Sequence, residues 1–154
     1  MEFAIEGSLL GQSNLCEPIL RLLPEWFGIE TAILNYEKEI DGLPTFLAKS
    51  GGQVLGFLSV KQHYPESGEI YVMGVRSEAR HGSIGRALMQ EAEVYLKSQG
   101  VEYLQVKTLS LSNPDPAYAQ TRTFYLAMGF RPLEEFEQIW DGHNPCLILV
   151  KRLS

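Results

Sequence analysis

The fold and chemistry of this chain depend on one stretch of sequence, Arg76-Ser77-Glu78-Ala79-Arg80-His81-Gly82-Ser83-Ile84-Gly85-Arg86. The small residues Gly82, Ser83 and Gly85 let a ligand approach the backbone closely, and a helix that begins here exposes amides without intrahelical partners. Three arginines add positive charge at the positive end of the helix dipole. Because the whole chain has a formal net charge of −6, this local basic excess predicts an anion site of the kind that holds a pyrophosphate.

The same stretch has a second interpretation, an ordinary glycine-containing turn between a strand and a helix, with its arginines in water. Two other phosphate-binding loops are excluded. The stretch lacks the Gly-Lys-Ser/Thr ending of a nucleoside triphosphate loop and the three spaced glycines of a dinucleotide fingerprint. Glycine spacing alone does not choose between the two interpretations that remain.

The residues on both sides of this stretch predict a strand, a long helix and a second strand. An apolar run at 69–75 precedes it, and a run at 101–109 follows the helix. Between them, one helical face carries Ile84, Leu88, Ala92 and Tyr95, and Gly100 ends the helix. A strand, helix and strand in this order predict a right-handed crossover between parallel neighbours.

The rest of the chain adds strands and helices on either side of this unit. Runs at 45–49 and 54–60 flank Ser50-Gly51-Gly52, which predicts a hairpin with a tight glycine turn. The other expected elements are an extended segment at 2–6, a helix at 15–23 capped by Ser13-Asn14 and ended by Pro24, a helix at 33–40, a loop at 110–117, a helix at 121–128, and strands at 136–140 and 146–151. The sum is a mixed sheet with helices on it, in one domain over residues 1–154.

Composition narrows the class of protein. With 45% hydrophobic and 21% charged residues, the chain resembles soluble globular proteins, and it has no apolar run of membrane-spanning length. The acidic balance argues against a nucleic-acid partner. The first residues lack the features of a signal peptide, so we expect a cytoplasmic protein. Two cysteines and three scattered histidines show no metal-ligand spacing, so no metal site is expected; a homodimer stays open.

The sequence resembles the GNAT superfamily of N-acetyltransferases at two motifs. The family's signature, Arg/Gln-x-x-Gly-x-Gly/Ala, falls on Arg80-His81-Gly82-Ser83-Ile84-Gly85, with Ser83 in place of the usual central glycine. The second landmark, an aromatic and a tyrosine before Gly-Phe, falls on Thr123-Phe124-Tyr125-Leu126-Ala127-Met128-Gly129-Phe130. The asparagine that many members carry seven residues before the tyrosine is Tyr118 here, and Asn113 lies upstream. The resemblance implies an α/β fold: a mixed, mainly antiparallel sheet with a central parallel pair and helices on both faces.

The resemblance also implies the cosubstrate and the residues that hold it. Acetyl-CoA would donate an acetyl group to an amine acceptor. The strand residues Met73, Gly74 and Val75 would hold its pantetheine arm and acetyl carbonyl. The pyrophosphate would lie on the loop and helix start, which comprise Arg80, His81, Gly82, Ser83, Ile84, Gly85 and Arg86.

Tyr125 would be the general acid, because a phenol with a pKa near 10 is protonated at neutral pH and suits a thiolate leaving group. The alternative is an ordinary half-buried aromatic residue on a helix. Glu69, at the start of its strand, could collect the amine proton, or it could be a solvated carboxylate at a strand end. An amine that arrives neutral would need no base.

The acceptor pocket is expected between the two early helices, where Trp26, Phe27 and Glu30 combine aromatic walls with a carboxylate that could hold a cation. The alternative is that the aromatic pair packs under a loop. Three functions stay open: acetylation of a small-molecule amine, acetylation of a protein or peptide, and a sensor that binds acyl-CoA without turnover. Fold resemblance does not choose the acceptor.

Overall fold

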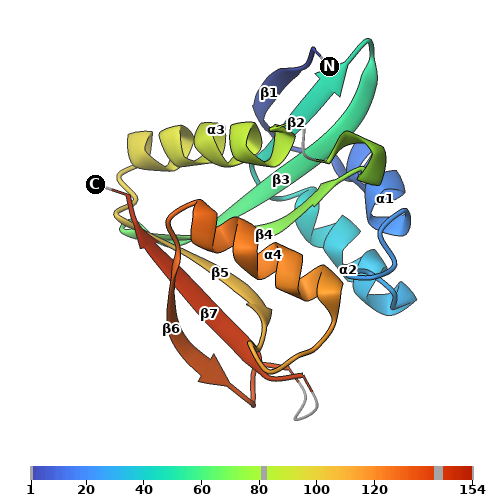
Figure 1. Cartoon of the computed structure of the whole chain (residues 1–154). Coiled ribbons are helices and arrows are strands. Elements are labelled where there is room, and N and C mark those ends of the chain that lie inside the picture. Colours follow the sequence, from blue (N-terminus) through green and yellow to red (C-terminus); the bar gives the residue numbers. More distant parts are fainter. Residues whose placement is uncertain (1, 81–82, 141–143, 154) are drawn as a thin grey trace.

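The computed structural model describes residues 2–80, 83–140 and 144–153. Strands and helices alternate along the chain (Figure 1). In chain order they are β1 Ala4–Leu9, α1 Ser13–Arg21, α2 Glu30–Ile40, β2 Thr45–Ser50, β3 Gln53–Tyr64, β4 Ser67–Val75, the 3-10 turn η1 Ser77–Ala79, α3 Ile84–Ser98, β5 Tyr103–Leu109, α4 Pro116–Ala127, β6 Arg131–Phe136 and β7 Cys146–Arg152. No helix in the described ranges is long and apolar enough to cross a membrane.

The described strands form one seven-stranded sheet in the order β1-β2-β3-β4-β5-β7-β6. Every neighbouring pair is antiparallel except β4 and β5, which are parallel. The predicted mixed sheet with a central parallel pair is confirmed. The predicted hairpin between β2 and β3 is also confirmed, and Gly51 and Gly52 have φ values of +57° and +83°, which favour glycine at both turn positions.

The two parallel strands separate soon after they meet. β4 pairs with β5 only from Ser67 to Glu69, opposite Tyr103 to Gln105. Beyond that point β4 continues against β3, and β5 continues against β7. The sheet therefore opens between Ile70–Val75 on one side and Val106–Leu109 on the other, and this opening is where a ligand can reach strand backbone in the middle of the sheet.

Helices cover both faces of the sheet, as predicted (Figure 1). α3 and α4 contribute buried side chains such as Leu88 and Tyr125 to one hydrophobic core. α1 and α2 contribute Ile19, Leu20 and Ile33 to a second core on the opposite face. The sheet separates the two cores, so a ligand in its opening can contact residues from both.

Three helix starts differ from the prediction: α2 begins at Glu30 instead of residue 33, and α1 and α4 begin at caps that the prediction did not include. Gln12, not Ser13-Asn14, occupies the cap position of α1, and the backbone N–H of Ser13 donates to the carboxylate of Asp41 at 3.1 Å. α4 begins at Pro116 instead of residue 121. There the carboxylate of Asp115 accepts from the N–H of Ala117 at 2.9 Å, and proline suits the first turn of a helix.

The strand predicted at 136–140 was wrong: β6 spans Arg131–Phe136. Its residues pair with β7, from Arg131 opposite Val150 to Phe136 opposite Cys146. β6 is the edge of the sheet, and its side chains are mostly exposed. An edge strand tolerates Pro132 and a pair of glutamates, which hid it from a search for apolar alternation.

Candidate active site

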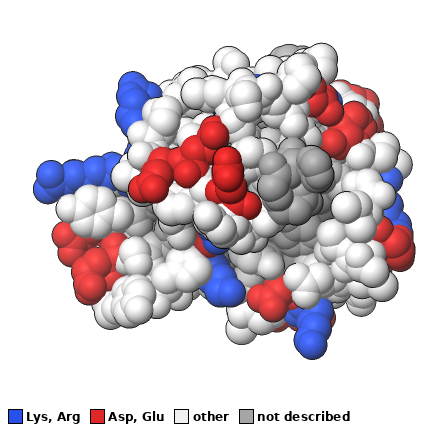
Figure 2. Space-filling view, turned by 90° about the horizontal axis from the view of Figure 1, so that it is seen from below, with Lys and Arg blue, Asp and Glu red and all other residues white. Residues whose placement is uncertain are grey.

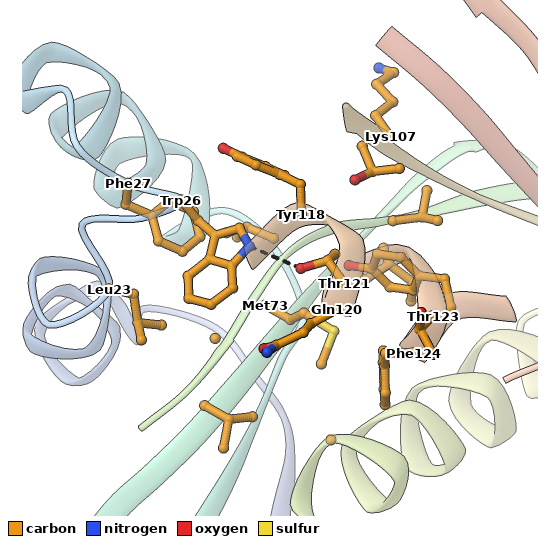
Figure 3. Close-up of a pocket in the computed structure, with 18 of the residues that line it drawn as sticks. Leu23, Trp26, Phe27, Met73, Lys107, Tyr118, Gln120, Thr121, Thr123 and Phe124 are labelled. Carbon is orange, nitrogen blue, oxygen red and sulfur yellow. Dashed lines mark hydrogen bonds between the residues drawn. The ribbon is translucent and has the colours of Figure 1, made fainter. Parts of the chain in front are cut away.

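A cleft of about 1210 Å³ lies at the opening between β4 and β5. Strand residues Ile70–Val75 and Val106–Leu109 line its floor, and side chains from α4, the start of α3 and the connection between α1 and α2 line its walls (Figure 3). The cleft brings together most of the residues that the sequence motifs singled out. Those that line it are Trp26, Phe27, Met73, Gly74, Val75, Arg80, Ser83, Ile84, Gly85, Arg86 and Tyr125.

One end of the cleft is the loop at the start of α3. Among the residues that the structure describes, no side chain caps this helix and its first turn contains no acidic residue, so its first amides are available to an anion. Gly85 lies against Phe124: a Cβ at this position would be 3.2 Å from two atoms of the ring. Arg80 and Arg86 line the same end. His81 and Gly82 lie outside the described residues.

Ser83 has a left-handed backbone conformation, with φ +68° and ψ +10°, at the cap position of α3. It is the position where the resemblance expects glycine, and an L-residue is strained there by about 1–2 kcal/mol. Ser83 therefore has a backbone geometry that favours glycine, and the strain falls on Ser83 itself.

We expect Ser83→Gly to raise the free energy of unfolding by up to about 1 kcal/mol. Relief of the left-handed strain outweighs the extra freedom of glycine in the unfolded chain. Ser83→Ala is the matched control. The hydroxyl of Ser83 makes no cap hydrogen bond, and alanine has the same backbone strain as serine, so the free energy of unfolding of this variant should equal that of the wild type. Urea denaturation measures both. A glycine variant less stable than the alanine variant would contradict the role given to the backbone.

Tyr125 is 6% exposed, on the face of α4 that meets the sheet. Its ring packs edge to face against Phe124 and Phe130, with centroids 5.5 Å and 5.7 Å away. Burial, and to a lesser degree the nearby Tyr36, raise the pKa of Tyr125 above its ordinary value. The hydroxyl therefore holds its proton at neutral pH, beside a cleft that its side chain lines.

Glu69 is buried behind the cleft. Its side chain is 5% exposed, its Oε1 lies 2.7 Å from Nε2 of His63, and its Oε2 lies 3.6 Å from Nζ of Lys107. Glu69 is not among the described residues that line the cleft, whereas Lys107 is. The interpretation of Glu69 as a solvated carboxylate at a strand end is thus wrong. The charged group that lines the cleft at this point is the ammonium of Lys107.

The opposite wall of the cleft is aromatic. Nε1 of Trp26 donates to Oγ1 of Thr121 at 2.9 Å (Figure 3). Arg80 lies over the indole ring, 4.7 Å from its centroid. Phe27 packs edge to face on Tyr36 at 5.6 Å. The aromatic pair predicted from the sequence therefore lies at the cleft, where the two residues also pack against other side chains.

The structure does not bring Glu30 to the cleft. Its carboxylate is 60% exposed and forms a double hydrogen bond with Arg21, at 2.6 Å and 2.9 Å. Helical spacing explains the difference, since Glu30 in the first turn of α2 faces the end of α1. Glu30, whose carboxylate was expected to hold a cationic acceptor, therefore forms a surface ion pair with Arg21 instead.

Several cleft residues had no signal in the sequence. Lys107, Thr108, Tyr36 and Tyr71 line the cleft at positions that no motif marks. The hydroxyl of Thr108 is buried and has no hydrogen-bond partner among the described residues. Tyr118 also lines the cleft, at the position where the resemblance expects asparagine.

Asn113 does not take the place of that asparagine. Its Oδ1 accepts from the N–H of Asp115 at 2.9 Å, and its backbone carbonyl accepts from Arg122 at 3.2 Å. Asn113 is absent from the described lining of the cleft. It shapes the loop before α4.

Comparison with known proteins identifies the family. Residues 16–130 match the model of the acetyltransferase (GNAT) family, which covers most of the chain, so the protein belongs to this family. Mycothiol acetyltransferase from Streptomyces bingchenggensis is 44% identical over 57 residues, which are 36% of this chain and 18% of that protein. The match therefore covers less than a fifth of the length of this relative.

Solved structures agree on the fold. A GNAT-family protein from Desulfovibrio desulfuricans superposes with a TM-score of 0.86 at 16% identity, covering 99% of this chain and 100% of that one. PaiA N-acetyltransferase from Thermoplasma acidophilum, solved in complex with coenzyme A, superposes with a TM-score of 0.76 at 17% identity, covering 99% of both chains. Within the described residues, no group of three or more histidine, cysteine or acidic side chains could hold a metal ion.

Proposed function

We propose that this protein transfers an acetyl group from acetyl-CoA to the primary amine of a small molecule. The observation that carries the proposal is the combination, in one cleft, of an uncapped basic helix start at one end and a buried, protonated tyrosine beside the strand opening. Family membership supports the same reaction.

The cleft offers groups that suit the separate parts of an acyl-CoA. Beyond Glu69, no described strand pairs with the β5 side of β4, so backbone groups from Met73 to Val75 remain available to a pantetheine arm. The start of α3, with Ser83, Gly85 and Arg86, would take the pyrophosphate. Bound acetyl-CoA supplies a thioester carbonyl, and the residues of the chain supply position and protons.

In this transfer a C–N bond forms and a C–S bond breaks, so the amine loses a proton and the thiolate needs one. Tyr125 is the proposed donor to the thiolate, because its raised pKa keeps the hydroxyl protonated. Glu69 is proposed as an indirect participant that positions other groups, since its carboxylate lies behind the cleft wall. A base in contact with the amine is not required if the amine arrives neutral.

A small acceptor is favoured over a protein by a contact that crosses the cleft. Trp26 lies in the connection between α1 and α2, on one face of the sheet, and its hydrogen bond reaches Thr121 of α4, on the other face (Figure 3). Arg80 packs on the same indole. A long peptide would need an open groove here, and these contacts interrupt it.

We expect release of free CoA thiol when the protein is mixed with acetyl-CoA and a suitable small primary amine. The assay compares amino acids, simple amines, polyamines, aminoglycosides and peptides at equal concentrations, with acetyl-CoA alone as the background. Turnover with small amines above the background supports the proposal. Turnover with peptides alone would contradict a small-molecule acceptor and indicate an enzyme that modifies proteins.

A thermal melt separates the remaining alternative, because a ligand that binds only the folded state raises the melting temperature. If CoA raises the melting temperature but no acceptor gives thiol release, the result would contradict catalysis and support a sensor that binds acyl-CoA without turnover. No stabilisation at millimolar CoA would contradict the cosubstrate as well.

A further inference from the structure

The charges that line the cleft have one sign. Arg80, Arg86 and Lys107 are the charged residues in its described lining, which contains no aspartate or glutamate. The remainder of the protein is acidic: the net charge is −6, and Figure 2 shows acidic side chains gathered in several groups on the face seen from below. The basic lining is therefore a local property of the cleft.

Lys107 lies far from the two arginines. Its Nζ is 3.6 Å from Oε2 of Glu69, at the point where β4 and β5 separate, while the arginines follow the other end of β4. At about 3.3 Å per strand residue, Glu69 and Val75 are roughly 20 Å apart. Figure 3 likewise shows Lys107 apart from Phe124, whose ring lies against Gly85 at the start of α3. The arginines therefore suit the pyrophosphate, and Lys107 is left for another group.

Lys107 is held in place by a buried support. The Glu69 carboxylate is shared between Lys107 and His63, on strands β5 and β3 respectively. At 3.6 Å the contact with Lys107 is an ion pair and not a hydrogen bond, so the buried carboxylate attracts the ammonium while its N–H donors remain for a ligand. Its side chain is 31% exposed, which leaves room for that ligand.

Aromatic side chains surround the same region. Tyr36 and Tyr71 line the cleft and pack edge to face, with centroids 5.8 Å apart. Burial first, and the charge of Glu69 second, raise the pKa of Tyr36, so this ring lies within electrostatic reach of the support of Lys107. Lys61 also lies near this pair, with its Nζ 5.5 Å from the centroid of Tyr71, but it is not part of the described lining of the cleft. In that lining, the region combines aromatic surface with one cation, Lys107.

We propose that the acceptor amine also carries a carboxylate, which binds Lys107, and an apolar or aromatic body, which packs on the tyrosines, as in an apolar amino acid. The proposal rests on the proposed acetyl transfer and names its substrate class. A single ammonium matches a singly charged carboxylate. Polyamines and other multiply charged cations are disfavoured because the described lining offers them a cation and no carboxylate.

The test compares two ligands that differ only in the carboxylate, N-acetyl-L-phenylalanine and N-acetylphenethylamine. Their affinities for the CoA-saturated protein are measured by calorimetry. We expect the carboxylate ligand to bind about tenfold or more tightly, the order of a partly desolvated charge-assisted contact. Equal affinities, or no binding of either ligand, would overturn the proposal.

Variants assign the preference to Lys107. Lys107→Met should remove it, Lys107→Arg should retain most of it, and Lys97→Met, at an exposed lysine of α3, should leave it unchanged. Because the methionine leaves Glu69 with one partner, the double variant Glu69→Gln/Lys107→Met removes both charges and should also lose the preference. A preference that persists in a folded Lys107→Met protein would overturn the assignment.

The calorimetric comparison tests the acceptor class and the thiol-release assay tests the acetyl transfer, so failure of one proposal can be distinguished from failure of the other. Thiol release with phenethylamine but no preference for the carboxylate ligand would leave the acetyl transfer in place and overturn the acceptor class. No thiol release with any amine would contradict the transfer, and the calorimetric comparison would still decide whether Lys107 recognises a carboxylate.

Discussion

Tyr125→Phe is expected to lower kcat by about 10²–10⁴-fold, the range that a positioned general acid contributes. The change deletes only the hydroxyl and keeps the ring, which packs between Phe124 and Phe130. CoA affinity and the free energy of unfolding should therefore change little. Steady-state kinetics with a turned-over amine, together with CoA titration and urea denaturation, measure all three quantities.

Tyr118→Phe is the matched control, because Tyr118 also lines the cleft from α4. It should reduce kcat much less than Tyr125→Phe if the donor is specific. A fully folded Tyr125→Phe protein with kcat within a factor of two of the wild type, and with chemistry shown to limit the rate, would remove Tyr125 as the general acid. Equal losses in the two variants would point to cleft polarity instead.

The pH profile offers an independent check. Burial raises the pKa of Tyr125 above the ordinary value near 10, so the hydroxyl keeps its proton as the pH rises to that value. We therefore expect that loss of the Tyr125 proton does not lower kcat below about pH 10. Any decline of kcat in that range should be the same in the wild type and in Tyr125→Phe. A decline near pH 8 that the variant abolishes would show that the pKa is lowered and would contradict this reasoning.

Arg122→Met is expected to lower the free energy of unfolding by about 3 kcal/mol. Arg122 is 7% exposed and donates to the backbone carbonyls of Leu109, Ser110 and Asn113, at distances from 2.9 to 3.2 Å. Methionine fills similar space but leaves these carbonyls without their donor, and a buried acceptor without a partner is costly. Urea denaturation without CoA measures the loss.

Arg131→Met is the control, because Arg131 also donates to backbone carbonyls, those of Leu126 and Phe130, but lies at the exposed edge of the sheet. We expect its substitution to cost within about 0.5 kcal/mol, as for most surface changes. Equal stability of Arg122→Met and the wild type would show that the loop before α4 does not depend on Arg122. Equal costs in the two variants would show that burial is not what matters.

Most of the fold could be predicted because it depends on neighbouring residues. The start of α3, its end near Gly100 and the glycine hairpin at Gly51-Gly52 each follow from backbone rules that act over a few residues. The failures were the elements whose signals are weak or supplied from afar. β6 lacks apolar alternation because it is an edge, and α1 takes its cap from Asp41, which is 28 residues away.

The candidate site divides in the same way. The sequence by itself determined the loop with Ser83, the place of Tyr125 on its helix and the aromatic pair Trp26-Phe27, since short motifs carry them. Local spacing does not say which distant side chains meet.

The tertiary structure alone decided the charge and the enclosure of the cleft. It buried Glu69 behind Lys107, committed Glu30 to Arg21, and joined Trp26 to Thr121 across 95 residues of chain. The physical reason is that β4 and β5 pair over three residues and then diverge, so packing between separate elements, which no local pattern encodes, selects the side chains that face the opening.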